Sequence, residues 1–257
     1  MNRVLGWGMA GLLTALITAL MSAPAAWLVP LMDHYSDGRI ALAEVEGTLW
    51  HGAALIGAAA AGDEAIAPLL PGRCAWYISP LLLLGKVDIQ LENPTLTEES
   101  INIHGDWSRW EIGAGSLKLP AEGLSALGAP INTLQPVGLM KIDWSSLSLI
   151  HEPGAWLLRG HLQIDLIDMA SALSPVKPIG AYRLQFDWFG RDATLDLQSL
   201  SGPLLIEGRG HIVDGHLKFS GQAWAEAGHE AQLRAVLGLL GQRRQLDDRI
   251  VTALEFE

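Results

Sequence analysis

The chain has 257 residues, a formal net charge of −11 at pH 7 and one cysteine, Cys74. A single thiol excludes an intramolecular disulfide framework and a zinc site built on several thiolates. The excess of acidic side chains argues against a nucleic-acid surface, which needs clustered Lys and Arg, and the length is sufficient to bury a core without covalent staples.

The N-terminal segment is apolar and uncharged. No charged side chain occurs between Arg3 and Asp33, and a helix of about 20 apolar residues crosses a hydrocarbon core of about 30 Å. The sequence therefore predicts a cytoplasmic N-terminus and transmembrane anchor within residues 1–32, followed by a separate domain over residues 33–257. The basic residue lies on the short side of the segment, which by the positive-inside rule keeps the N-terminus cytoplasmic.

Two interpretations of this segment remain open. The tripeptide Ala23-Pro24-Ala25 resembles the small-residue site at which a signal peptidase cleaves. The apolar run nevertheless continues from Trp27 to Leu31, beyond the roughly 7 to 15 residues of a signal-peptide core, and a tryptophan suits a membrane interface. An uncleaved anchor is therefore the favoured interpretation.

Two-residue alternation of apolar and polar side chains dominates the rest of the chain. Between Lys86 and Glu92, the side chains of Val87, Ile89 and Leu91 point to one face, and the polar side chains point to the other. The same alternation recurs at residues 140–144, 162–166, 184–188, 195–197 and 217–219. These segments are predicted to be strands of a sheet with one polar face.

Short turn signals separate the predicted strands and favour antiparallel pairing. Asp214-Gly215 is a strong hairpin signal, because a type I′ turn needs positive φ at both central residues. Residues 189–192, Asn93-Pro94 and Gly202-Pro203 also mark strand ends. The connections are too short for the crossover helices that parallel pairing requires.

Helical patterns after the N-terminal segment are few and short. They occur at residues 121–127, 166–173 and 229–240, and only the last has a broad apolar stripe. Two stretches about 45 residues apart also share a weak similarity, which predicts an internal repeat of strand, short helix and strand around residues 117–188.

The apolar faces of the predicted strands need cover. About eight to ten strands each present about three large apolar side chains, and burial of each is worth roughly 1.5–3 kcal/mol. Three short helices do not cover a flat sheet of this size. The predicted fold class is therefore mainly β: a curved, largely antiparallel sheet, half-barrel or sandwich-like, with a few short helices, whose apolar face closes on itself or holds an apolar ligand or partner strand.

The sequence predicts no enzyme, no cofactor and no metal site. His211 and His216 flank Asp214-Gly215, but a two-residue turn pairs His216 with Val213, so the two imidazoles do not converge on a metal. The chain also contains no G-x-S-x-G nucleophile motif.

Tryptophan is frequent, with ten in the chain. Most of these side chains are expected in the core. The alternative is an exposed docking surface or a ligand groove, because large aromatic side chains contribute strongly to binding. The candidates for this surface are Trp50, Trp76, Trp107, Trp110, Trp144 and Trp188.

Glycine, proline and tryptophan landmarks follow one another in a specific order along the chain. They are Gly47-Thr48-Leu49-Trp50-His51-Gly52, Leu70-Pro71-Gly72, Ser79-Pro80-Leu81-Leu82, Gly105-Asp106-Trp107, Leu119-Pro120-Ala121, Leu127 to Gly138, and Gly221-Gln222-Ala223-Trp224-Ala225. In these landmarks the chain resembles the type II secretion system protein N family. The resemblance implies a single-pass protein of the inner membrane of a Gram-negative bacterium, with a periplasmic β-rich domain, an accessory part in protein secretion and no cofactor.

Three hypotheses about function follow. The first is an accessory secretion component whose strand edges or aromatic patches dock other subunits of the inner-membrane platform. The second is a periplasmic lipid-binding or lipid-transfer module that uses the apolar face of a curved sheet. The third, a periplasmic hydrolase, requires a convergent acid, base and nucleophile that the spacing does not reveal.

Overall fold

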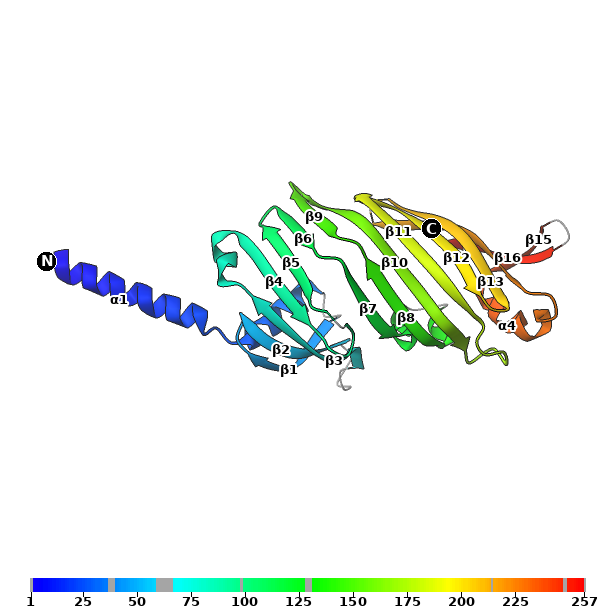
Figure 1. Cartoon of the computed structure of the whole chain (residues 1–257), viewed down its shortest axis with the longest axis horizontal. Helices are drawn as coiled ribbons and strands as arrows, with labels where there is room; N and C mark the ends of the chain where they lie inside the picture. Colours follow the sequence, from blue (N-terminus) through cyan, green and yellow to red (C-terminus); the bar gives the residue numbers. More distant parts are fainter. Residues whose placement is uncertain are drawn as a thin grey trace. The chain divides into compact units, whose positions relative to one another are not determined.

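The chain folds mainly as antiparallel β-strands, which form two compact units (Figure 1). The computed structural model describes residues 2–36, 40–58, 67–97, 99–127, 131–213, 215–246 and 249–256. Unit 1 comprises Met1–Trp107, and unit 2 comprises Ser108–Glu257. The prediction of a mainly β, antiparallel protein with few helices is confirmed.

The N-terminal segment begins with one long helix. Helix α1 spans Asn2–Met21, a short 3₁₀ turn η1 spans Ala25–Trp27, and α2 spans Leu28–Tyr35. The helix ends before Pro24, which has an extended backbone (φ −68°, ψ 143°), because a proline disfavours helical geometry in the residue that precedes it. The uncharged run therefore does not form a single helix.

No helix among the described residues combines the length and the apolar character required to cross a membrane. The N-terminal anchor and the domain boundary at residue 32 thus stay predictions.

Unit 1 contains a meander of five strands, each paired with the next in the chain. The strands are β1 (Ile40–Gly47), β2 (His51–Ala58), β3 (Ala67–Ile78), β4 (Lys86–Glu92) and β5 (Ile101–Asp106). The 3₁₀ turn η2 (Pro80–Leu84) joins β3 to β4. It begins at Ser79, whose hydroxyl accepts a hydrogen bond from the Leu81 N–H, and it ends at Gly85, where φ is +87°. The strand predicted between Lys86 and Glu92 is confirmed.

Unit 2 contains one open sheet and a thin helical layer. Its strands are β6 (Arg109–Ile112), β7 (Gly115–Pro120), β8 (Pro136–Trp144), β9 (Leu147–Glu152), β10 (Ala155–Ser171), β11 (Gly180–Gly190), β12 (Asp192–Ser201), β13 (Leu204–Val213), β14 (His216–Ala225), β15 (Gln242–Leu246) and β16 (Arg249–Phe256). Its helices are η3 (Ala121–Leu127), α3 (Ile131–Leu134) and α4 (Glu230–Leu240). The predicted helices at residues 121–127 and 229–240 are confirmed.

Strand β10 organises this sheet. Its first part pairs with β9 and its longer second part pairs with β8, while β11 pairs along its other edge. From β10 to β14 each strand pairs with the next, and β16 and β15 follow. In the β13–β14 hairpin, Val213 pairs with His216 as predicted, and Asp214 of the predicted turn lies outside the described residues.

The prediction of a helix over residues 166–173 is wrong, because β10 continues to Ser171. A β-bulge explains the misleading pattern. Asp168 has φ +51°, and the registers of β10 with both β8 and β11 shift at this point. The bulge places Leu166 and Met169 in the same core although they are three residues apart, which resembles helical spacing.

The core of unit 2 lies between the sheet and its helices. Leu233 and Val236 of α4 are 0% and 1% exposed and pack with Tyr182 and Leu204 of the sheet. A neighbouring cluster contains Leu195, Phe219, Ala223 and Leu254. The described strands of unit 2 thus form one sheet that is partly covered by helices, and they do not form the two stacked sheets of a sandwich.

The predicted repeat around residues 117–188 maps onto two strands that flank β10. Asp143 on β8 pairs with Gln163, and Asp187 on β11 pairs with His161. The segment before β8 contains η3 and α3, whereas the structure assigns no helix between β10 and β11 among the described residues. The repeat therefore stays a prediction.

Candidate interaction surface

The strand registers of unit 2 align apolar side chains in rows on one face of the sheet. One row joins Trp144, Leu162 and Phe186, and the next joins Ile142, Ile164 and Leu184. Leu184 and Phe186 pack against the buried cluster beside α4. The helical layer therefore covers only part of this face.

The remaining part of the face forms what we call the apolar strip, defined by Ile142, Trp144, Leu162, Ile164 and Trp188. All five side chains are half-buried, and neither buried cluster of the described residues includes them. They come from three adjacent strands, β8, β10 and β11. Neighbouring apolar side chains without a covering layer are typical of a binding surface.

An aromatic cluster lies on the strands next to the apolar strip. The Trp110 and Trp156 rings meet edge to face with centroids 5.8 Å apart, and the His151 and Trp156 rings lie 4.5 Å apart. Trp156 is 46% exposed, while Nε1 of Trp110 is buried without a hydrogen-bond partner among the described residues. Because side chains alternate along β10, Trp156 shares the face of Leu162.

The other candidate tryptophans have structural contacts. Trp50 is 3% exposed, and its Nε1 donates to the Leu20 carbonyl at 2.9 Å. Indole groups also donate to main-chain carbonyls from Trp76 to Leu49 at 3.1 Å, from Trp107 to Leu82 at 2.9 Å and from Trp144 to Gly113 at 2.8 Å. A Cβ at Gly52 would overlap the Trp76 ring, and one at Gly115 would overlap the Trp144 ring, which explains the glycines at these positions.

The six predicted tryptophans are divided between the two units. Trp144 and Trp188 belong to the apolar strip and Trp110 lies on β6, which pairs with β9, all in unit 2. Trp50, Trp76 and Trp107 belong to unit 1. Sequence reasoning missed Trp156 and His151. Their signal was the alternation of Trp156 with Leu158 and Leu162 along one strand.

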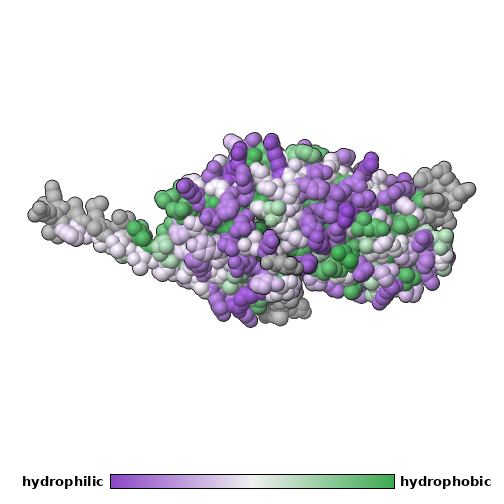
Figure 2. All heavy atoms as spheres, in the orientation of Figure 1, coloured by the Kyte–Doolittle hydropathy of each residue, from purple (hydrophilic) through white to green (hydrophobic). Residues whose placement is uncertain are grey.

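The opposite face of the unit 2 sheet is polar, and Figure 2 shows hydrophilic side chains gathered over β10 and β11. Arg183 forms a two-point ion pair with Asp165, with distances of 2.7 Å from Nε to Oδ1 and 2.9 Å from Nη2 to Oδ2. The side-chain hydrogen bond with Asp165 raises the pKa of Arg183. His161 Nδ1 lies 2.8 Å from an Asp187 carboxylate oxygen. In these pairs, polar side chains of adjacent strands satisfy one another's hydrogen-bonding groups.

Asp143 extends this polar network. Burial raises the pKa of its carboxyl group, but hydrogen bonds from Lys141, at 2.9 Å, and from Ser116 outweigh this effect, so the pKa lies below its ordinary value. A carboxyl group with a lowered pKa stabilises the fold above its unfolded pKa, and this contribution is lost as the pH falls through the folded pKa.

We expect the stability difference between the wild type and Asp143→Asn to shrink as the pH falls from 6 to 3. The reason is that protonation removes from the wild type the same charge that the substitution removes. Thermal unfolding at each pH measures this difference. Asp192→Asn, at an exposed position, is the matched control, and an Asp143→Asn difference that stays constant over this pH range would contradict the assignment.

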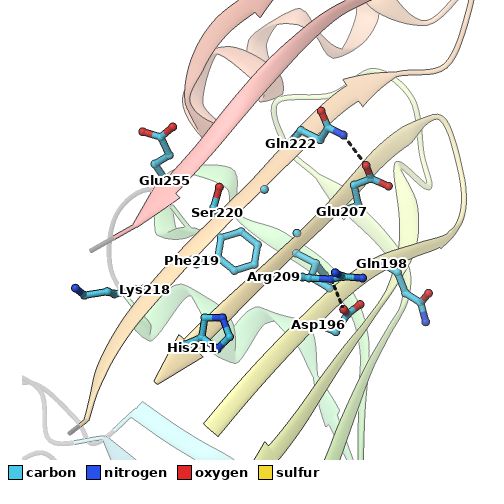
Figure 3. A pocket seen from close by; sticks show the side chains of 13 residues that line it. Asp196, Gln198, Glu207, Arg209, His211, Lys218, Phe219, Ser220, Gln222 and Glu255 are labelled. Atoms are coloured by element: carbon cyan, nitrogen blue, oxygen red, sulfur yellow. Dashed lines mark hydrogen bonds and ion pairs between the residues drawn. The ribbon is translucent and has the colours of Figure 1, made fainter. Parts of the chain in front are cut away.

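The polar face also contains an open hollow over β12, β13, β14 and β16 with a volume of about 1320 Å³ (Figure 3). Its wall includes Asp196, Arg209, His211 and Lys218. Among the described residues, no three His, Cys, Asp or Glu side chains converge as a metal ion requires. His211 pairs with Lys218 across β13 and β14, and it does not face His216. This arrangement agrees with the predicted hairpin.

Fold and surface together define the class: an open antiparallel β-sheet protein with a partial helical layer and an uncovered apolar strip. Comparison of the sequence with known protein families identifies the family within this class. The model of the type II secretion system protein N family matches residues 38–252, and the chain belongs to this family. No curated protein and no solved structure matches the chain. The predicted resemblance is confirmed, and it connects the chain with type II secretion.

Proposed function

We propose that the chain is an accessory component of the type II secretion apparatus that acts through protein–protein contacts of its β-sheet. The observation that carries this proposal is the apolar strip, because sheets bury such faces against a covering layer and α4 does not reach it. Other secretion subunits are the partners that family membership implies. Docking a partner helix or strand on the strip would complete the burial of these half-buried side chains.

Site-specific photocrosslinking tests this proposal in cells. A photoreactive amino acid at Leu162, on the apolar strip, is expected to give adducts with inner-membrane platform subunits. The same group at Gln163, the next residue on the opposite face, is the matched control. Intact secretion in a deletion strain, together with no adduct from position 162, would overturn the proposal.

The proposed location is the inner membrane, with a single N-terminal span, a cytoplasmic N-terminus and a periplasmic β-rich region. The charge pattern of residues 1–33 supports this orientation. The contacts after α1 support retention of the anchor: Ala23 and Ala25 are each 1% exposed, and the Leu49 N–H donates to the Ala23 carbonyl at 2.8 Å. A segment packed in this way is part of the fold of unit 1.

We therefore expect the mature protein to keep its N-terminal segment. Intact-mass measurement of the protein purified from membranes should give a mass that includes residues 1–25. A mature form that begins at Ala26 would show cleavage at the small-residue site and would contradict the anchor.

A second candidate function, lipid binding, is favoured by the chemistry of the apolar strip. Its five side chains carry no charge, and their only polar groups are the indole N–H groups of Trp144 and Trp188. The Trp144 indole already donates to the Gly113 carbonyl, so the strip matches an acyl chain. Native mass spectrometry of the gently purified protein would then find phospholipid, and Leu162→Asn would reduce the lipid-bound fraction while Gln163→Asn would not. Absence of lipid from the wild type would exclude this second candidate.

A further inference from the structure

The hollow on the polar face of unit 2 has an unusual distribution of charge. Its lining contains three acidic side chains, Asp196, Glu207 and Glu255, and it also brings together Arg209, His211 and Lys218. Lys218 pairs directly opposite His211, and Arg209 precedes His211 by two residues on the same strand face, about 7 Å away along β13. Ser220 lies opposite Arg209 and adds a hydroxyl group.

Each acidic side chain in the hollow has a hydrogen-bond or ion-pair partner, which for Asp196 is Arg209 itself. Glu255 forms an ion pair with Arg244 at 3.1 Å, and Glu207 accepts a hydrogen bond from Gln222. Asp196 accepts from Nε of Arg209 at 3.2 Å (Figure 3), and the Arg209 side chain is 87% exposed, so its Nη groups are accessible from solvent. No acidic side chain of the described chain lies within ion-pair distance of His211 or Lys218.

Because His211 and Lys218 lie directly opposite each other in the sheet, one bound anion can accept hydrogen bonds from both side chains. Tetrahedral oxyanions present several acceptor oxygens, which lysine, histidine and the planar guanidinium recognise by charge-assisted hydrogen bonds. The hollow is open, so a ligand reaches it from solvent.

We propose that this hollow binds an anion of the phosphate class through His211, Lys218 and the Nη groups of Arg209, with the Ser220 hydroxyl as a further donor. Free phosphate and the phosphodiester headgroup of an anionic lipid share this chemistry. The site lies on the face opposite the apolar strip, so it is independent of docking or lipid binding there.

Calorimetric titration of the full-length chain in nonionic detergent tests the site. One probe is inorganic phosphate, and the other is glycerophosphoglycerol, the water-soluble headgroup of phosphatidylglycerol. Lys218→Gln and His211→Gln should each weaken binding by about tenfold, the effect of losing one charge-assisted hydrogen bond. Asp196→Asn should strengthen binding, because it removes the carboxylate that competes for Arg209.

Lys86→Gln is the matched control, since it removes the same charge at an exposed position in unit 1. Both tested side chains are exposed, so melting temperatures close to that of the wild type verify that the variants fold. Lys218-dependent binding of either probe supports the proposal, and the preferred probe identifies the source of the anion. Absence of binding for both probes, or an equal loss in Lys86→Gln, would overturn it.

Discussion

Replacing Trp50 by alanine is expected to lower the free energy of unfolding by about 3–5 kcal/mol, the range for large aromatic side chains removed from a core. Trp50 is 3% exposed, and its indole N–H donates to Leu20 in the last turn of α1. The substitution therefore leaves a cavity and also removes the hydrogen bond that joins α1 to the strands. Thermal unfolding followed by circular dichroism measures the loss.

Two further variants separate these contributions. Trp50→Phe keeps most of the apolar volume and removes the donor, so it should cost about 1–2 kcal/mol. Trp107→Ala removes an indole that also donates to a main-chain carbonyl but is 65% exposed, and it should cost about 1 kcal/mol. Equal losses of unfolding free energy for Trp50→Ala and Trp107→Ala would show that the burial of Trp50 is not the source of its contribution to stability.

Leu233→Ala should destabilise unit 2 by about 2–5 kcal/mol. Leu233 is 0% exposed at the centre of the core formed by α4 and the sheet. Truncation leaves a cavity at the position where the helical layer holds the sheet, so α4 should also exchange its amide hydrogens faster. Denaturant unfolding and hydrogen exchange measure these two effects.

Leu239→Ala is the matched control on the same helix. It makes the same chemical change at a side chain that is 39% exposed, so the helix-propensity contribution is equal and the packing loss is small, below about 1 kcal/mol. Comparable losses for the two variants would contradict the assignment of Leu233 to the core.

Local patterns in the sequence predicted the strands well. Alternation located β4 and the central parts of β8, β10 and β11, because each of these segments has one face against apolar neighbours. The Asp214-Gly215 signal also predicted the pairing of Val213 with His216. Both features depend on residues close in sequence, which is why they can be read without the fold.

Features that depend on distant residues were harder to predict. The bulge at Asp168 interrupts the alternation of β10, and the sequence alone offered a helix as the simpler explanation. The candidate site was also only partly predictable. Indole hydrogen bonds that join residues 25 to 31 positions apart determine which tryptophans are structural, and these contacts exist only in the folded chain.

The contacts between α1 and the strands of unit 1 make the joint after the helix stiff. The Leu20 and Ala23 carbonyls, one on each side of the helix end at Met21, accept hydrogen bonds from Trp50 and Leu49, two consecutive residues just before β2. A tilt of α1 about this point would have to break both bonds or carry the start of β2 with it. A force that moves α1 is therefore transmitted to the strands of unit 1.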